Sequence, residues 1–414
     1  MHNTHTTADQ VLVRRLNTAL ILEHLRKAGR LSRAALSAST GLNRSTVSSI
    51  ISELLEASLV RETDEQASTG GRPGLLVEIN PAGGAAIGVE LGVDVLSVIL
   101  TDFVAGVLWR ERIASDPTEA QAVILERVES LVQQAIDLAA NEGLKLRGIG
   151  LGVPGLVDLH EGRLIFAPNL HWHDVPLRAR WMQKFAVPVF VENEANAAAL
   201  GEYYFGNTHT AHHLIYLSAN VGLGGGIIID GRLFRGKGGY GGEIGHMMID
   251  PQGELCGCGK RGCWETLVGP QAMVQRIQLA IHNGAHTTIP ALAGGDLSTL
   301  TNSTAIKALA TAALTGDAVA LDALDYVAHH LGIGIANLIN IFNPELIILG
   351  GALNLLSRFL LPRIEATVSK NALASPRAEV QIVPSAHGVD ACAMGAVALV
   401  LDDVLREPEF RTSL

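Results

Sequence analysis

The hydrophobic pattern of this 414-residue chain changes once, and the change divides the chain into two units. Through the first 60 residues, apolar side chains recur every three or four positions, which is the spacing of amphipathic helices. From Ala85 onward, short runs of valine, isoleucine and leucine alternate with glycine-rich turns and longer amphipathic stretches, as in an α/β fold. A proline and two glycines interrupt regular structure at residues 80–84. The sequence therefore predicts a small helical head followed by a larger α/β body.

Composition excludes several classes of protein. Hydrophobic residues make up 48% of the chain and charged residues 17%, a balance that predicts a globular protein rather than a disordered one. No stretch approaches the ~20 uncharged apolar residues that span a bilayer, so no membrane partner is expected. The first residues do not form a secretory signal, and four cysteines do not build a disulfide scaffold, so we expect a cytoplasmic protein.

Basic charge is concentrated in the head, although the net charge of the chain is −10. Residues 1–60 carry seven basic and four acidic side chains, a net of +3, so the remaining residues hold −13. Because the negative charge of the body repels the phosphate backbone, we expect contact with nucleic acid through the head and not through the body.

The head carries the capping and spacing signals of three helices. The first begins after a cap at Asp9 and extends to about Lys27, Ser32 caps a short second helix, and Asn43 caps the third. The first helix has an apolar stripe made of Leu12, Leu16, Ala19, Leu22 and Leu25. The third has a stripe made of Val47, Ile50, Ile51, Leu54 and Leu55. With the tight turn at residues 40–42, this spacing predicts a helix-turn-helix.

The other face of the third helix suits a DNA major groove, because short hydroxyl groups can donate or accept hydrogen bonds there without a steric clash. Strands predicted at residues 59–61 and 75–79, joined by a polar loop, add a wing. Arg72, between glycine and proline in that loop, is placed to enter a minor groove. The predicted DNA-binding residues are Arg44, Ser45, Thr46, Ser48, Ser49 and Arg72. The alternative is a helical protein-docking domain with solvated serines.

Three of the four cysteines lie close together, and His246 precedes them by ten residues. Three thiolates and one imidazole complete the tetrahedral shell of a zinc ion, so Cys256, Cys258, Cys263 and His246 are the predicted ligands. With no open position, the zinc would be structural. The alternatives are reduced cysteines in a glycine loop and, less favoured by the spacing, a redox pair. Cys392 is flanked by apolar residues, so we predict that it is a small buried hydrophobic side chain.

Polar side chains recur at the ends of predicted strands in the body. Paired amides and carboxylates suit a polyhydroxylated ligand, since each sugar hydroxyl both donates and accepts. The predicted sugar-binding residues are Asn169, Asn193, Glu194, Glu243, His246 and Glu265. No catalytic residue is predicted, although Glu194 would be the base if the chain were a kinase. Glycine-rich turns at residues 89–94, 220–226 and 347–351 are weak signals for phosphate binding, and the first contains Glu90 and Asp94, which repel phosphate.

Over nearly its whole length the chain resembles the ROK family, named for repressor, open reading frame and kinase. The motifs are VENEANAAALGE at residues 191–202, GEIGH at 242–246 and CGCGKRGCWE at 256–265. The resemblance implies an actin-like, ribonuclease-H-like body of two α/β subdomains around a cleft, with the six sugar-binding residues and the four zinc ligands named above. It divides the chain into a winged helix-turn-helix at 1–81, a first subdomain at 82–200 completed by a C-terminal helix at 387–405, and a second subdomain with the zinc site at 201–386.

Departures from the family's kinases favour a regulator. Kinase members have Asp-x-Gly-x-Thr in the first turn, where this chain has Glu90 and Asp94. They have Gly-Thr-Gly in the second turn, where this chain has Asn-Val-Gly at residues 220–222. Glu194 replaces their catalytic aspartate. The resemblance is greatest to the xylose-repressor branch. It implies a homodimer or homotetramer that binds operator DNA and is released by a free sugar. Two alternatives stay open: an ATP-dependent sugar kinase with a DNA-binding head, and a sugar-independent activator or scaffold.

Overall fold

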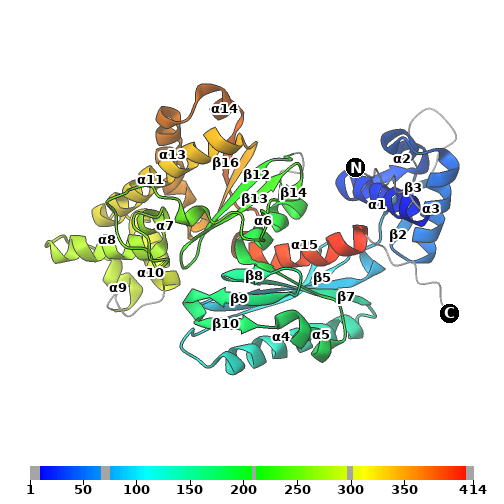
Figure 1. Cartoon of the computed structure of the whole chain (residues 1–414), viewed down its shortest axis with the longest axis horizontal. Helices are drawn as coiled ribbons and strands as arrows, with labels where there is room; N and C mark the ends of the chain where they lie inside the picture. The colour runs from blue at the N-terminus through cyan, green and yellow to red at the C-terminus, as the bar shows by residue number, and fades with distance from the viewer. Residues whose placement is uncertain (1–9, 67–74, 208–210, 296–301, 407–414) are drawn as a thin grey trace, which may run out of the picture.

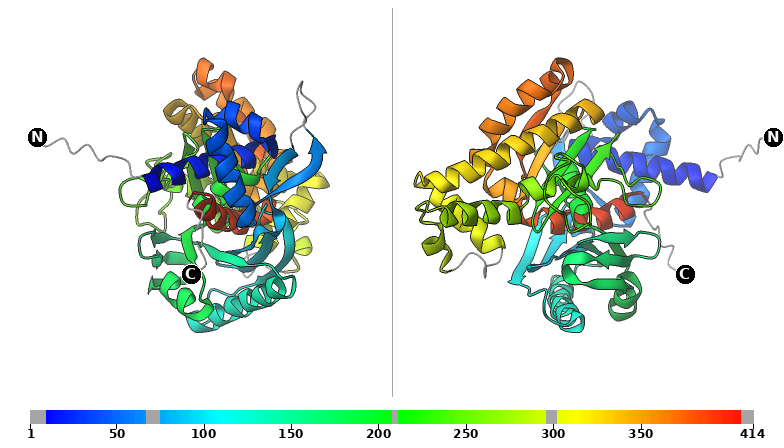
Figure 2. Two further views of the ribbon diagram at one scale, coloured as in Figure 1. Left: turned by 90° about the vertical axis from the view of Figure 1, so that its right-hand side faces the viewer. Right: turned by 60° about the vertical axis from the view of Figure 1, so that its left-hand side comes forward.

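The computed structural model describes residues 10–66, 75–207, 211–295 and 302–406, and it consists of a head and two lobes (Figure 1). The predicted cap Asp9 and the predicted wing residue Arg72 lie outside the described residues. The head and the helical end of the second lobe lie at opposite ends of the molecule (Figure 2). Helix α15 crosses the middle and ends beside the head (Figure 1).

The head is a helix-turn-helix with a small antiparallel sheet of order β1-β3-β2. Its elements are α1 (Gln10–Ala28), β1 (Arg30–Ser32), α2 (Arg33–Thr40), α3 (Arg44–Glu56), β2 (Val60–Gln66) and β3 (Leu75–Ile79). Two predicted caps are confirmed: the side chain of Ser32 accepts a hydrogen bond from Ala35 N, and that of Asn43 accepts one from Thr46 N. Gly41 ends α2 with φ of 73°, a left-handed conformation that favours glycine. The short strand β1 was not predicted.

The predicted apolar stripe of α1 is only half buried. Leu22 and Leu25 belong to the core of the head, whereas Leu12 and Leu16 are 40% and 60% exposed. The first turn of α1 projects beyond α2 and α3 (Figure 2), although the Arg14 side chain reaches Glu53 of α3. Periodicity identified the helix correctly but placed its first two turns in a core that does not extend so far.

The first lobe is built on a five-stranded sheet of order β6-β5-β4-β7-β11. Its elements are η1 (Pro81–Gly83), β4 (Ala85–Leu91), β5 (Val95–Asp102), β6 (Val107–Ala114), α4 (Gln121–Asn141), β7 (Leu146–Val153), α5 (Leu177–Phe185) and β11 (Val189–Asn193). A small antiparallel sheet, β10-β9-β8, stands beside it. That part comprises β8 (Leu156–Asp158), β9 (Arg163–Ala167), η2 (Pro168–Leu170) and β10 (Trp172–Val175).

The second lobe repeats the same strand order, β14-β13-β12-β15-β16. Its strands are β12 (Leu214–Ala219), β13 (Leu223–Ile229), β14 (Arg232–Leu233), β15 (Leu346–Gly351) and β16 (Gln381–Pro384). In each sheet three antiparallel strands are followed by two strands parallel to the first of them. This duplicated pattern confirms the predicted body of two ribonuclease-H-like subdomains.

Helices cover the second lobe away from the head (Figure 2). They are η3 (Ile244–His246), α7 (Glu265–Val268), α8 (Pro270–His282), α9 (Ile289–Ala293), α10 (Asn302–Leu314), α11 (Ala318–Phe342), α12 (Ala352–Leu355), α13 (Ser357–Asn371) and α14 (Ala374–Glu379). Across the described ranges, no helix is by itself long and apolar enough to cross a membrane; α10 and α11 reach the threshold only as a pair bent by 111°.

Two helices join the lobes. Helix α6 (Glu194–Phe205) connects the first lobe to the second, and η5 (Gly388–Asp390) with α15 (Ala391–Arg406) returns the chain to the first. The predicted subdomain boundary at residue 200 falls inside α6. The two helices cross at glycines: a Cβ at Gly395 would lie 1.6 Å from the Ala197 carbonyl oxygen, and one at Gly201 would lie 2.7 Å from the Gly395 nitrogen. Only glycine permits this approach, which sets the lobes around one hinge.

Candidate functional site

A cavity of about 450 Å³ lies between the lobes. The first lobe contributes Glu90 and Asp94 from the turn after β4, and Glu194 from the first turn of α6. Main-chain turns and side chains of the second lobe form the opposite wall, which includes Asn354 and Lys307. The first and second predicted glycine turns therefore meet across one cleft, as phosphate-binding turns would.

Three carboxyl groups dominate the electrostatics of this cavity. Burial raises the pKa of Glu90, although Arg112 Nη1 lies 3.0 Å from its Oε2 and favours the charged form. Burial, with added repulsion from the neighbouring carboxylates of Glu90 and Asp94, raises the pKa of Glu194 to about 8. The cavity thus holds three carboxyl groups together with the cations Arg112 and Lys307, and position 94 offers no hydroxyl to bind a phosphate.

Asn193 is held by the helix that follows it. Its Oδ1 accepts hydrogen bonds from Ala195 N at 2.9 Å and Asn196 N at 3.2 Å, which caps α6. Its Nδ2 donates to the Gly155 carbonyl oxygen at 3.1 Å. The cap fixes the amide in place and leaves one N–H for a ligand hydroxyl, so this predicted sugar contact is chemically available.

A second, much smaller cavity of about 40 Å³ lies on the other side of Asn193. Asn193 and Glu243 both line it, together with glycines of β13 and of residues 239–242. Because a water molecule occupies roughly 30 Å³ in the liquid, this space is too small for a monosaccharide. A monosaccharide would fit here only if the lobes or the glycine segment moved apart.

Two polar residues of this cavity were missed by the sequence analysis. Asn196 is 4% exposed; its Nδ2 donates to Glu192 at 3.2 Å, while its Oδ1 is buried without a partner among the described residues. Glu192 is 1% exposed and pairs with Arg235 of the second lobe at 2.8 Å. The ion pair holds the lobes together beside the cavity. The i, i+3 spacing of Asn193 and Asn196 was the available signal for the second amide.

The other predicted sugar residues do not all converge. Glu194 faces the larger cavity, and Glu243 lines the smaller one, where burial raises its pKa. His246 and Glu265 meet at the cysteines, with Nδ1 and Oε1 3.4 Å apart. Asn169 is exposed on η2 and lines neither cavity. The described structure therefore brings Asn193 and Glu243 together directly and leaves Asn169 apart.

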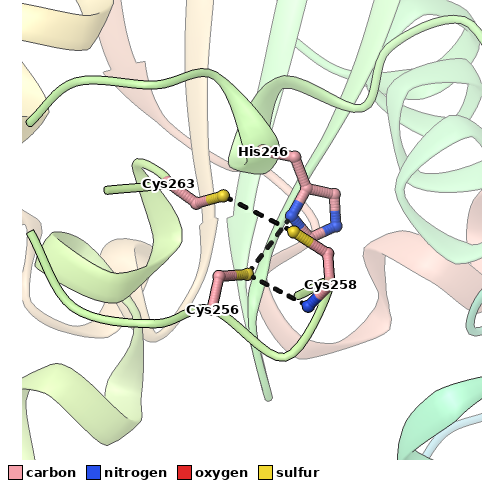
Figure 3. A group of neighbouring side chains, drawn as sticks. All are labelled: His246, Cys256, Cys258 and Cys263. Atoms are coloured by element: carbon pink, nitrogen blue, oxygen red, sulfur yellow. Dashed lines mark hydrogen bonds between the residues drawn. The ribbon is translucent and has the colours of Figure 1, made fainter. Parts of the chain in front are cut away.

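His246, Cys256, Cys258 and Cys263 form one cluster, with ligand atoms that all lie within 4.8 Å of one another (Figure 3). The sulfurs of Cys258 and Cys263 are 3.6 Å apart, as are the Cys256 sulfur and the His246 Nδ1. Since Zn–S bonds are about 2.3 Å long, sulfurs on a tetrahedral zinc stand about 3.8 Å apart. The donor set and its spacing thus fit zinc.

The surroundings of Cys256 would favour a bound cation. Burial, with added repulsion from Glu265, raises the pKa of the Cys256 thiol, whose sulfur lies 2.7 Å from Glu265 Oε1. A thiolate at that point becomes favourable when a cation binds beside it. The cluster also joins η3 to α7, so an ion bound there would fix Glu243 relative to Glu265.

The predicted DNA face lies on α3. Arg44, Ser45 and Ser49 are exposed, and Thr46 and Ser48 are half-buried. Not every hydroxyl is free for bases: Ser45 donates to Asn43 Oδ1 at 2.7 Å, and Ser49 accepts from Arg14 Nη2 at 2.9 Å.

Arg14 was missed, because in the sequence it lies on the polar side of a different helix. It also forms an ion pair with Glu53, which anchors α1 against α3. A guanidinium contributed by α1 therefore lies beside the predicted DNA face.

Comparisons with known proteins agree with this architecture. The ROK family model matches residues 86–403, and the model described as winged helix-turn-helix DNA-binding matches residues 16–61. The xylose repressor of Caldicellulosiruptor bescii is 35% identical over 402 residues, covering 97% of this chain and 99% of that protein.

Two solved structures extend the comparison. A ROK family transcriptional regulator described as a homologue of the Escherichia coli Mlc protein has a TM-score of 0.80 at 29% identity, covering 95% of this chain and 98% of that one. The ROK family glucokinase of Streptomyces griseus, solved with glucose and AMPPNP, has a TM-score of 0.66 at 31% identity, covering 76% of this chain and 99% of that one. With a ROK model matched across both lobes and a winged helix-turn-helix model matched in the head, this chain belongs to the ROK family.

Proposed function

We propose that this protein is a transcriptional repressor that binds operator DNA through its winged head and is released when a free sugar binds between the lobes. The observation that carries the proposal is the carboxyl cluster of Glu90, Asp94 and Glu194 in the cleft of a body that bears a DNA-binding head. The cluster opposes nucleotide binding, while the amide and carboxylate groups beside it suit sugar hydroxyls.

The proposed sugar is a monosaccharide, with xylose first, because a relative named xylose repressor matches this chain over nearly its full length. Asn193, Glu194, Glu243, His246 and Glu265 are proposed to surround it, with Asn169 joining them when the lobes rearrange. Zinc is proposed as a structural ion on His246 and the three clustered cysteines, where it would hold the Glu243 segment in register.

The proposed active form is a homodimer or homotetramer. One winged head gives too little contact area for tight, specific binding, whereas two heads read two half-sites about one helical turn apart. Arg44, Ser45, Thr46, Ser48, Ser49 and Arg72 are proposed to contact the operator. A regulator of this kind acts where the DNA is, so the proposal includes a cytoplasmic location.

One observation favours a second candidate, an ATP-dependent sugar kinase. Glu194 follows β11 at the cleft, and its pKa of about 8 suits a base that accepts a proton from a sugar hydroxyl. A kinase would release ADP only when both sugar and ATP are present, and Glu194→Gln would abolish that release. The repressor proposal expects no sugar-dependent ADP release from the wild type or from Glu194→Gln.

The deciding experiment is fluorescence anisotropy on DNA from upstream of the protein's own gene, titrated with pentoses, hexoses and amino sugars at fixed salt. The proposal expects tight binding that one sugar weakens without ATP, by about 5- to 150-fold for a coupling of 1–3 kcal/mol. Tight binding that no sugar changes would contradict the sugar-responsive part. Sugar-dependent ADP release without DNA binding would favour the kinase.

A further inference from the structure

A cavity of about 660 Å³ lies where the head meets the body. Leu25 of α1 lines it from the head, and Phe103 and Leu401 line it from the body. These three side chains are at most 3% exposed and belong to one continuous hydrophobic cluster. The volume lies within the ~300–1,000 Å³ typical of ligand pockets. The cavity is separate from both interlobe cavities and has a largely apolar floor.

Cationic side chains predominate around this cavity. Three arginines and one glutamate line it, Arg26, Arg30, Arg61 and Glu78, and Arg26 is paired with Glu23 outside the lining. Glu78 is shared, since Arg61 Nη2 lies 2.6 Å from its Oε1 and Arg30 Nε lies 3.2 Å from its Oε2. Guanidinium groups form forked hydrogen bonds to carboxylate, sulfonate and phosphate oxygens, so this lining favours an anion.

One buried polar atom at the cavity lacks a partner. His387, in the segment before η5, lines the cavity, and its Nε2 is buried with no hydrogen bond in the described part of the chain. Its ring lies edge-on to Phe205, with centroids 6.5 Å apart. Because this nitrogen has almost no accessible surface, the His387 ring would have to turn before a polar atom in the cavity could reach it.

We propose that this junction cavity is a second ligand site, for a small organic anion with an apolar ring body. The ring would lie against the apolar lining beside Val104, the acidic group would face Arg61 and Arg30, and His387 Nε2 would reach a ligand polar atom after a turn of its ring. Because α1 and α15 both border the site, a bound anion would hold the head in one orientation on the body. The site is distinct from the proposed sugar site.

Anilinonaphthalene sulfonate, a fluorescent aromatic anion, is the probe, and N-phenylnaphthylamine, the same ring system without the sulfonate, is its neutral counterpart. Titrations of the full chain contain neither DNA nor sugar, so their result is independent of the repressor proposal. Two variants change the site at exposed positions: Arg61→Gln removes a rim charge, and Val104→Trp obstructs the mouth. Their matched controls are Arg33→Gln, which pairs with Glu62 elsewhere in the head, and Val107→Trp, equally exposed on β6.

We expect one sulfonate probe per chain, binding weakened about fivefold or more by Arg61→Gln and by Val104→Trp, and less than about twofold by either control. The neutral probe should bind about tenfold more weakly than the anion. The site would be overturned if the sulfonate probe showed no saturable binding. It would also be overturned if the two site variants bound the probe with the same affinity as their controls. Equal affinity for the two probes would overturn its preference for an anion. Circular dichroism of each variant verifies that the head remains folded.

Discussion

Replacing Arg26 with alanine tests how the head is coupled to the cleft. The Arg26 guanidinium, on α1, lies 4.4 Å from the ring centroid of Tyr204, and its Nη1 donates to the Tyr204 carbonyl oxygen at 3.5 Å. The Tyr204 hydroxyl donates to Asp402 of α15. Tyr204 lies in the last turn of the helix that begins at Glu194 in the interlobe cleft. A shift of α6 on sugar binding would therefore reach the head through Arg26.

The size of the effect follows from these contacts. Arg26 is 14% exposed, so its stacking on Tyr204 contributes about 1–2 kcal/mol. Glu23 loses one partner but keeps Lys27, 3.2 Å away. If sugar and DNA are coupled by 1–3 kcal/mol, losing this contact removes most of the coupling. We expect the sugar-induced fall in operator affinity to be smaller by about 5- to 30-fold in Arg26→Ala, up to its complete loss.

The assay is operator anisotropy with and without saturating sugar, alongside calorimetric titration of sugar alone. Sugar affinity should be unchanged, because Arg26 lines neither interlobe cavity. Lys27→Ala is the matched control: it removes a positive charge that pairs with the same Glu23 but is 42% exposed. A wild-type response in Arg26→Ala, or an equal loss in Lys27→Ala, would refute this route.

Three further outcomes are expected. Cys256→Ser should abolish the zinc measured by mass spectrometry and lower the Tm, and a chelator should lower the Tm of the wild type only; wild type purified without zinc would contradict the site. Glu194 has its pKa raised from 4.5 to about 8, so it stabilises the fold below pH 4.5 and loses that contribution as pH rises to 8. As pH rises through this window, the free energy of unfolding of Glu194→Gln should increase relative to that of the wild type, by up to about 1.4 kcal/mol per pH unit in urea unfolding. A difference that does not change with pH would refute the burial argument. Asn196→Leu should weaken sugar binding about tenfold by calorimetry, since it removes the orphaned buried acceptor; equal affinity would show that the sugar does not contact it.

Features that depend on near neighbours in the chain were predictable. The caps at Ser32 and Asn43 lie three residues from the amides they bind, and the left-handed turn at Gly41 requires the residue type found there. Cys256, Cys258 and Cys263 lie within one short loop, so their convergence needed only a tight backbone. The alternation of strands and helices likewise predicted two α/β subdomains.

Features that depend on distant partners were not predictable. Arg26 meets Tyr204 across 178 positions, and Glu192 meets Arg235 of the other lobe across 43. The exposure of Leu12 and Leu16, the separation of Asn169 from Asn193, and the orphaned Oδ1 of Asn196 depend on which elements stand nearby.

The division between the two has a physical reason. The sequence by itself determined caps, turns, helices, strands and the cysteine loop, because these rest on hydrogen bonds and backbone preferences within a few residues. Only the tertiary structure decided which polar groups share a cavity, how large it is and how the head touches the hinge helices. Those depend on the close packing of Gly201 against Gly395, which sets the positions of both lobes at once.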